Sequence, residues 1–327
     1  KQGGVAFVLW IFLTVACLFA ELWVGNRALW VQVNGKNYFP VVQGQLSGRE
    51  LGLGYEHEAN YRELAKTQTP ILMPLIPYSP TENALASHSP SSYGPSEPNA
   101  AHKHYLGTDP LGRDILARLA YGYRNALIFA AMYLIGLTII GTLLGMAFGY
   151  YGGALDFWGQ RLIEIWSNIP FIYVVMIVAS ITVPNLFWLV VLSLVFGWTG
   201  LAAFVRTLCF RDKTREFVLA AKASGASDFR IITQHLLPQL GTILLTFLPF
   251  QAVGAITTLT SLDFLGFGLR PPTPSWGELL RTGSSSLQAP WIVLSVVVAL
   301  ATILILLTII GNALREAFDP KALLRYK

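Results

Sequence analysis

Long apolar stretches recur along the chain, and short polar or charged segments separate them. Six stretches are long enough to cross a bilayer, which takes about 20 helical residues. They lie at about 4–24, 126–149, 161–183, 186–205, 240–263 and 291–311. The third is the weakest, because Arg161 and Glu164 sit in its first turns and Pro170 can kink it. The pattern predicts an all-α polytopic membrane protein with six transmembrane helices.

The composition supports this interpretation. Of the 327 residues, 54% are hydrophobic and only 13% are charged, against about 25% in soluble domains. The mean hydropathy is +0.52. Cys17 lies inside the first predicted span and Cys209 at the end of the fourth, so we expect neither a disulfide nor a metal site from them.

Basic residues in the short loops predict the orientation, because such loops face the cytoplasm. The segment 206–238 carries Arg206, Arg211, Lys213, Arg215, Lys222 and Arg230, and the tail 315–327 carries Arg315, Lys321, Arg325 and Lys327. Both are predicted to be cytoplasmic. With six helices the N-terminus is cytoplasmic too, and residues 25–125 lie outside. The net charge of +5 follows from this bias, so no nucleic-acid partner is implied.

The first apolar stretch, 1–24, has two possible interpretations. A signal peptide is the weaker one, because the stretch is longer than a signal-peptide core and no small-residue cleavage site clearly follows it. We therefore expect a retained transmembrane helix. The chain begins at Lys1 rather than Met, so we expect further residues to precede it in the natural protein.

Residues 25–125 form the one large extramembrane piece. Polar and apolar residues alternate around Asn34-Gly35, which predicts a short β-hairpin. The seven prolines between Pro70 and Pro98 predict loop with little regular structure. Apolar residues are too sparse here for a large independent core, so we expect the piece to pack against the spans or against a partner subunit.

An amphipathic helix is predicted over 104–127, leading into the second span. Thr108 is the candidate N-cap, with Pro110 just inside it. Asp109, Arg113 and Asp114 fall on its polar face as local ion pairs. Composition alone favours an interfacial helix over a binding site here, because surface ion pairs are common and contribute little.

The segment 206–238 contains a run of small residues: Ala220, Ala221, Ala223, Ser224, Gly225, Ala226 and Ser227. Ala221 and Gly225 lie one helical turn apart, and Gly225 is expected to end or bend the helix before a second helix runs to Pro238. Such a run is also typical of tight packing between membrane helices. The basic residues around it argue against burial in lipid, so we favour docking of a cytoplasmic partner.

Motifs for catalysis and nucleotide binding are absent from the sequence. It contains no GxxxxGK[ST] phosphate-binding loop, no HExxH or GxSxG, and no Cys/His cluster. We therefore expect no enzyme and no metal or cofactor in this chain. His102 and His104 flank Lys103, but two histidines alone rarely hold a metal, so we interpret them as structural.

The sequence LAAKASGASDFRIITQHLLP resembles the EAA loop of ATP-binding-cassette (ABC) importer permeases, whose coupling helices seat in the ATPase. The matching residues are Ala220, Ala221, Gly225, Leu237 and Pro238. Leu219 stands where the family usually has Glu, which puts one coupling contact in question. His235 stands where a generic importer has Ile, although peptide permeases often have His there.

Three further motifs narrow the resemblance. The sequence LGTDPLGRD at 106–114, including Gly107, Thr108, Asp109, Gly112, Arg113 and Asp114, resembles the external signature of dipeptide and oligopeptide permease C-type subunits. The sequences SLDFLGFG at 261–268 and PPTPSWGELL at 271–280 resemble their fifth-span exit and the following loop, and GNALREAFDPK at 311–321 resembles their C-terminal end. These motifs and NGKNYFP at 34–40 make the chain most similar to Yej-type permeases. Those permeases are associated with oligopeptides and microcin C.

This resemblance implies a non-catalytic transport subunit with the six-helix type I importer permease fold. Its domains would be helix 1 at 1–24, an external insertion at 25–125, a permease core at 126–314 and a cytoplasmic tail at 315–327. It implies a bacterial inner-membrane location and partners that include a second permease, ATPase subunits that bind ATP and Mg²⁺, and a periplasmic solute-binding protein. The cargo would be a peptide.

Two acidic residues near the spans are candidates for the translocation path, because a charge exposed to lipid is costly. Glu164 is expected first of all to pair with Arg161. Asp263, near the outer end of the fifth span, either attracts the amino terminus of a peptide or simply reaches water at the interface. Two alternatives to a peptide importer stay open: an importer of nickel or another small solute, and an autonomous ion-coupled carrier.

Overall fold

The computed structural model describes residues 2–51, 57–67, 69–82, 95–100 and 102–318. It divides into two compact units. The first unit comprises Lys1–Trp10, Ala126–Leu262 and Ile303–Lys327, and the second comprises Ile11–Asn125 and Asp263–Thr302. The predicted cytoplasmic residues 319–327 lie outside the described residues. Each unit is described by itself below.

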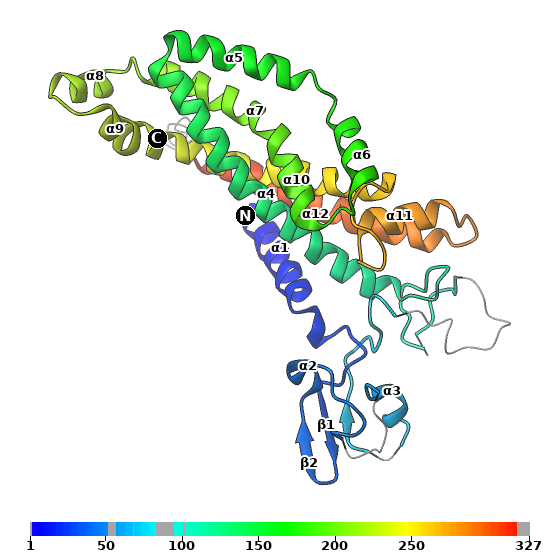
Figure 1. Cartoon of the computed structure of the whole chain (residues 1–327). Coiled ribbons are helices and arrows are strands. Elements are labelled where there is room, and N and C mark those ends of the chain that lie inside the picture. The colour runs from blue at the N-terminus through cyan, green and yellow to red at the C-terminus, as the bar shows by residue number, and fades with distance from the viewer. Residues whose placement is uncertain (1, 52–56, 68, 83–94, 101, 319–327) are drawn as a thin grey trace. The chain divides into compact units, whose positions relative to one another are not determined.

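The structure is mostly helical, as predicted. The long helices are α1 (Gln2–Leu18), α4 (Ile115–Tyr151), α7 (Leu186–Asp212), α10 (Leu237–Leu265) and α12 (Pro290–Ala317), and α1, α4, α10 and α12 contain residues of both units. Shorter helices are α5 (Gly153–Ser167), α6 (Phe171–Ile181), α8 (Glu216–Ala223), α9 (Asp228–Arg230) and α11 (Trp276–Ser284). In the first unit, α5 packs beside α7 (Figure 1).

Four helices among the described residues are long and apolar enough to cross a membrane. They are α4, α7, the continuous stretch Asp228–Leu265 and α12. The pair α5 and α6 passes the same test only as a bent pair, with an angle of 66° between the two helices. Helix α1 is apolar but has 17 residues. Six transmembrane helices therefore remain a prediction, and four or five are supported.

The bend between α5 and α6 falls inside the predicted third span. Helix α5 ends at Ser167, and Pro170 stands immediately before α6 with φ −68° and ψ 111°. Proline disfavours a helical conformation at the residue before it, here Ile169, and cannot donate a backbone hydrogen bond itself. The sequence around Pro170 therefore breaks the helix, whereas the prediction left it continuous and kinked.

Three glycines on one face of α4 bring it close to α7. A Cβ at Gly145 would lie 2.6 Å from the carbonyl oxygen of Ala202, and one at Gly149 would lie 2.6 Å from that of Arg206. Gly141 meets the side chain of Leu201 in the same way. These positions recur every four residues, so they form the small-residue face that lets membrane helices approach closely.

The second unit contains the three-stranded antiparallel sheet, in the order β2-β1-β3. Strand β1 is Trp30–Val33, β2 is Lys36–Tyr38 and β3 is Ile71–Leu72. Asn34 and Gly35 have φ values of 52° and 73°, as a two-residue type I′ hairpin turn requires. The predicted hairpin is confirmed.

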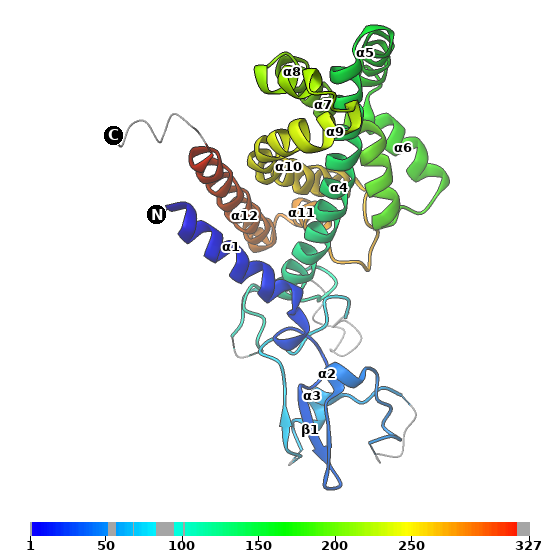
Figure 2. The same cartoon turned by 90° about the vertical axis from the view of Figure 1, so that its left-hand side faces the viewer.

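Short helices lie beside the sheet, and a small core forms there. Helix α2 (Pro40–Gln43) packs against β1, and α3 (Tyr61–Leu64) follows further along the chain (Figures 1 and 2). The buried residues Ala28, Val31, Val33, Leu51, Ala59 and Tyr61 form one cluster. This core is small, in agreement with the few apolar residues of the segment.

Candidate functional site

The segment between α7 and α10 folds as two short helices joined by a turn. Gly225 has φ +81°, a left-handed conformation that favours glycine, so α8 ends there and the chain reverses. The hydroxyl of Ser227 then accepts a hydrogen bond from the backbone N–H of Arg230 and caps α9. Helix α9, a π-helical stretch at Ile231–Leu236 and α10 continue as one helix. The predicted helix–turn–helix is present.

The small residues of this segment lie at the surface. Leu219 is 54% exposed, Ala220 and Gly225 are exposed, and Ala221 is half-buried. A Cβ added at Gly225 would meet no atom within 4 Å among the described residues. Further along, His235 is half-buried and Leu237 and Pro238 are exposed. The outer face of α8 and the turn is therefore free for a partner's backbone or side chains to approach.

An apolar core behind α8 and α9 fixes their position. Val218 from α8 is buried against Ile231 and Leu236, in one cluster with residues of α7 and α10. On the rim, the Tyr150 hydroxyl donates to Asp228 Oδ1 over 2.6 Å. Lys213 Nζ donates to the carbonyl oxygen of Gly149 over 2.9 Å. The segment is thus an ordered platform with a buried inner face.

Residues 104–114 do not form the predicted amphipathic helix, because α4 begins only at Ile115. Thr108 is not an N-cap: its hydroxyl accepts a hydrogen bond from the backbone N–H of Ser96 over 2.8 Å. The carboxylate of Asp114 instead accepts from the N–H of Ala117 over 2.7 Å, as an N-cap does. Helix α4 then runs through residue 125, the predicted end of the insertion.

The loop is held in shape by its aspartate and its glycines. Asp109 Oδ1 accepts from the backbone N–H groups of Leu111 and Arg113, over 2.9 and 3.0 Å. Gly107 and Gly112 have φ values of 78° and 72°, which favour glycine. These local hydrogen bonds compete with helix formation, and this competition explains why the predicted helix is absent.

The charged residues of the loop are buried rather than on a polar surface. Asp109, Arg113 and Asp114 are at most 3% exposed. Arg113 Nε lies 2.6 Å from Asp109 Oδ2, and its terminal nitrogen lies 2.9 Å from Glu278 Oε1 on α11. The other oxygen of Glu278 pairs with Arg118 over 2.5 Å. Two carboxylates and two guanidinium groups thus form one neutral buried cluster.

The carboxylates of the cluster favour the charged form of Arg113. Burial lowers the pKa of Arg113, but the carboxylates of Asp109 and Glu278 raise it, and the net pKa lies above the ordinary value. Arg118 also donates to the carbonyl oxygen of Pro80 over 2.9 Å. The cluster therefore ties the loop, the start of α4, α11 and the segment around Pro80 together within the second unit.

Sequence reasoning missed Glu278 and Arg118 as partners in this cluster. One signal was available, because Ser275 and Glu278 have the S-x-x-E spacing of a capping box. The Ser275 hydroxyl accepts from the backbone N–H of Glu278 over 3.2 Å, at the start of α11. That motif predicts a helix start, but it cannot predict which distant arginines meet the glutamate.

Asp263 and Glu164 have different surroundings. Asp263 is 4% exposed; it accepts from the backbone N–H of Leu269 and from the hydroxyl of Ser275, each over 2.6 Å. A carboxylate that simply reaches water is therefore the wrong description of Asp263, and its contacts favour a role in fixing the turn after α10. Glu164 pairs with Arg161 over 2.5 Å as predicted, and both side chains are 54% exposed.

The histidines and cysteines occupy structural positions. His104 Nδ1 lies 2.8 Å from Asp114 Oδ2, and its ring stacks on Tyr78 with centroids 3.9 Å apart. Cys17 and Cys209 are both free. Within the described ranges, no group of three or more His, Cys, Asp or Glu side chains is arranged to hold a metal ion. The candidate site is thus the α8–α9 platform, whose small residues are exposed on its outer face.

Known transport proteins are similar to this chain in sequence. Residues 141–323 match the family described as "Binding-protein-dependent transport system inner membrane component". The inner membrane ABC transporter permease protein YejE of Escherichia coli is 39% identical over 95% of this chain and 92% of its own length. The oligopeptide transport system permease protein OppC of Haemophilus influenzae is 34% identical over 67% of this chain and 70% of its own.

One further relative and one solved structure are also similar to this chain. The peptidoglycan transport system permease protein YejE of Agrobacterium fabrum is 43% identical over 68% of this chain and 58% of its own length. A chain of the inward-facing MetNI methionine ABC transporter aligns with a TM-score of 0.53 and 17% identity, over 62% of this chain and 98% of its own. That structure shows a shared fold. The chain belongs to the family of binding-protein-dependent transport system inner membrane components, as the resemblance predicted.

Proposed function

We propose that this chain is the transmembrane permease subunit of an ATP-driven importer for oligopeptides or peptide-like compounds. The names of its relatives mention oligopeptides, dipeptides and peptidoglycan. All of these cargoes contain short peptides. Similarity to Yej-type permeases adds microcin C as a candidate cargo. The chain itself performs no covalent chemistry, and ATP and Mg²⁺ are bound by its ATPase partners.

The observation that supports the proposal most directly is the α8–α9 platform. Its outer face consists of Leu219, Ala220 and Gly225, which are exposed, and its inner face is fixed by Val218 and Ile231. Small side chains let the backbone of another protein approach closely. Closure of the ATPases on ATP would pull on this platform and drive alternating access of the permease pair.

The same proposal includes the topology and the outer partners. Six helices with both termini in the cytoplasm place the sheet-containing insertion 25–125 outside the bacterial inner membrane. There, this insertion and the 106–114 loop would meet the solute-binding protein or shape the entrance. A second homologous permease completes the translocation path.

Purification of the intact complex tests the proposal. The chain is isolated in mild detergent, copurifying proteins are identified by mass spectrometry, and ATPase activity is measured with and without peptide-loaded binding protein. Recovery of a second permease and an ATPase, with stimulated hydrolysis, is expected. Recovery of this chain alone, still transporting in liposomes without ATP, would show an autonomous carrier.

An Ala220→Arg variant tests the platform itself. Ala220 is exposed on α8, where arginine is a good helix former, so the fold should tolerate the change. We expect loss of the copurifying ATPase, because a large charged side chain blocks close approach. Ala317→Arg, at the exposed end of α12, is the matched control and should retain the ATPase. Equal retention in both variants would contradict the assignment of the platform.

A further inference from the structure

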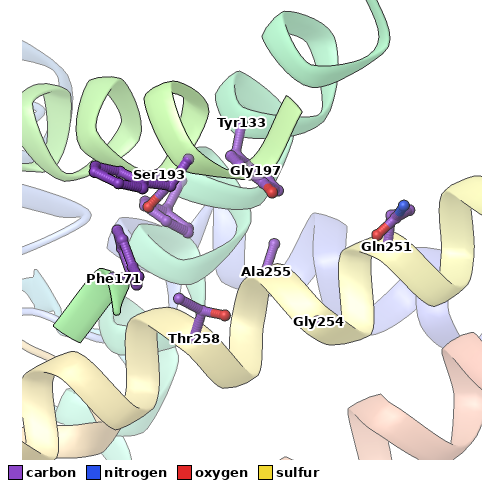
Figure 3. Close-up of a pocket in the computed structure, with 10 residues that line it drawn as sticks. Tyr133, Phe171, Ser193, Gly197, Gln251, Gly254, Ala255 and Thr258 are labelled. Carbon is purple, nitrogen blue, oxygen red and sulfur yellow. The ribbon is translucent and has the colours of Figure 1, made fainter. Parts of the chain in front are cut away.

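A cavity in the first unit lies among four helices. Side chains from α4, α6 and α7 line one side of it, and α10 lines the other (Figure 3). Its volume is about 340 Å³, at the lower end of the range of about 300–1,000 Å³ for ligand pockets. The space has room for one large side chain and adjoining backbone of a peptide.

Aromatic rings form one wall of this cavity. Phe129 and Tyr133 of α4 stack with ring centroids 6.1 Å apart and an interplanar angle of 4°. Phe171, the first residue of α6, lies 5.7 Å from the ring of Phe196 on α7, centroid to centroid. The bend before α6 therefore brings a ring to the cavity. Such walls favour an aromatic or aliphatic guest.

Polar groups occur on the remaining sides, including the side chains of Ser193, Gln251 and Thr258. Ser193 is 6% exposed, and its hydroxyl has no hydrogen-bond partner in the part of the chain that the structure describes. By contrast, Thr257 and Ser261 of α10 donate to carbonyl groups of their own helix. A buried hydroxyl without a partner is unfavourable. The Ser193 hydroxyl therefore indicates a guest that forms a hydrogen bond with it.

A second cavity in the same unit has a different, apolar lining. It has a volume of about 480 Å³ and is lined by apolar side chains such as Ile140, Leu162 and Val191, together with tryptophans. The indole N–H of Trp166 there already donates to the carbonyl oxygen of Val195 over 2.7 Å. A lipid chain fits such a lining, because it makes no hydrogen bonds. The first cavity, with its unpaired hydroxyl, suits a guest that has polar atoms.

The first cavity also excludes charge. Its lining contains no Asp, Glu, Lys, Arg or His, all lining residues being within the described ranges. A charged side chain would therefore be buried without a counter-charge, which is costly. We propose that this cavity receives an uncharged aromatic or large aliphatic side chain of the peptide during transport, while Ser193 and Gln251 hydrogen-bond to the peptide amide groups next to that side chain. The inference rests on the proposed function and deepens it.

Two glycines of α10 supply a matched test. Gly254 lines the cavity and Gly241 does not, and a Cβ at either would meet no atom within 4 Å among the described residues. Gly254→Leu therefore fills the cavity, whereas Gly241→Leu makes the same change elsewhere on the helix. Uptake of Ala-Phe-Ala and of Ala-Ala-Ala is measured with the whole complex in proteoliposomes, with the same binding protein throughout.

The expected result is a change in selectivity. In Gly254→Leu the uptake of Ala-Phe-Ala relative to Ala-Ala-Ala should fall about tenfold, the scale of one lost aromatic contact with its burial. Gly241→Leu should keep the wild-type ratio. Gly254→Ala, a milder filling, should lie in between, and copurification of the ATPase checks that each variant assembles.

Other results would overturn the inference in distinguishable ways. An unchanged ratio in Gly254→Leu, or an equal loss of both peptides, would show that the cavity holds a lipid chain or nothing. Failure of the wild-type complex to move either peptide would refute the proposed function as well. Independently of transport, Thr258→Cys should be protected from maleimide by Ala-Phe-Ala and not by Ala-Ala-Ala, and absence of that difference would also count against the cavity.

Discussion

At the scale of single residues, the buried charges of the second unit are the most consequential feature. Glu278 gives one oxygen to Arg113 and the other to Arg118, and both arginines are nearly inaccessible to water. A buried ion pair contributes little net stability compared with an apolar replacement, because burial of the charges is costly. Removal of one partner is different, because it leaves a charge buried without compensation.

Glu278→Gln is therefore expected to destabilise the second unit. It leaves Arg118 without its carboxylate, and the loss of one partner of a buried pair costs about 3–5 kcal/mol. The measurement is the apparent Tm of the purified complex. Glu164→Gln is the control: its pair with Arg161 is exposed and contributes about 0–1 kcal/mol, so its Tm should change little. Equal Tm values for the two variants would contradict the buried cluster.

The loop glycine Gly107 gives a second prediction at this scale. Its φ is +78°, and a Cβ there would lie 2.6 Å from the carbonyl oxygen of Ser96. Gly107→Ala combines left-handed strain of about 1–2 kcal/mol with this clash, so the loop must move. Gly35→Ala, in the hairpin turn with φ +73°, has the strain alone, because its Cβ would meet no atom within 4 Å among the described residues. Limited proteolysis should cut Gly107→Ala faster than Gly35→Ala; the reverse order would exclude the close packing.

At the scale of elements, one hydrogen bond joins the edge of the α8–α9 platform to α4. The Tyr150 hydroxyl at the end of α4 donates to Asp228 at the start of α9. A hydrogen bond to a charged group contributes about 1.5–3 kcal/mol. Tyr150→Phe should therefore loosen α9 and speed its backbone hydrogen exchange, while Tyr151→Phe, at the exposed neighbouring position, should not. Equal exchange rates in the two variants would show that the apolar core alone holds α9.

Several elements could be predicted from local sequence alone. The Asn34-Gly35 turn requires two residues with positive φ, and the turn at Gly225 requires one, so both follow from residue chemistry. The prediction of a helix at 104–114 was wrong, because Asp109 accepts hydrogen bonds from the backbone of its own loop. Which distant charges meet there, as with Glu278 and Arg118, depends on tertiary packing, and no local pattern encodes it.

At the scale of the whole molecule, the number of membrane crossings depends on the bent pair α5 and α6. If the pair is one broken span, the chain crosses the membrane three times between the hairpin turn and the α8–α9 platform, through α4, the pair and α7. As a re-entrant loop, it would return to the side from which it entered, leaving two crossings. An odd number places the two surfaces on opposite sides of the membrane, and an even number places them on the same side.

Site-directed labelling decides between these topologies. Lys36→Cys in the hairpin and Ser224→Cys in the platform are both exposed positions, and the parent chain, with half-buried Cys17 and buried Cys209, gives the background. Because the proposed function needs the platform in the cytoplasm and the insertion outside, an impermeant maleimide applied to spheroplasts should label Lys36→Cys directly and Ser224→Cys only after permeabilisation. Labelling of both from outside would make α5 and α6 a re-entrant loop, and the platform could not then reach an ATPase.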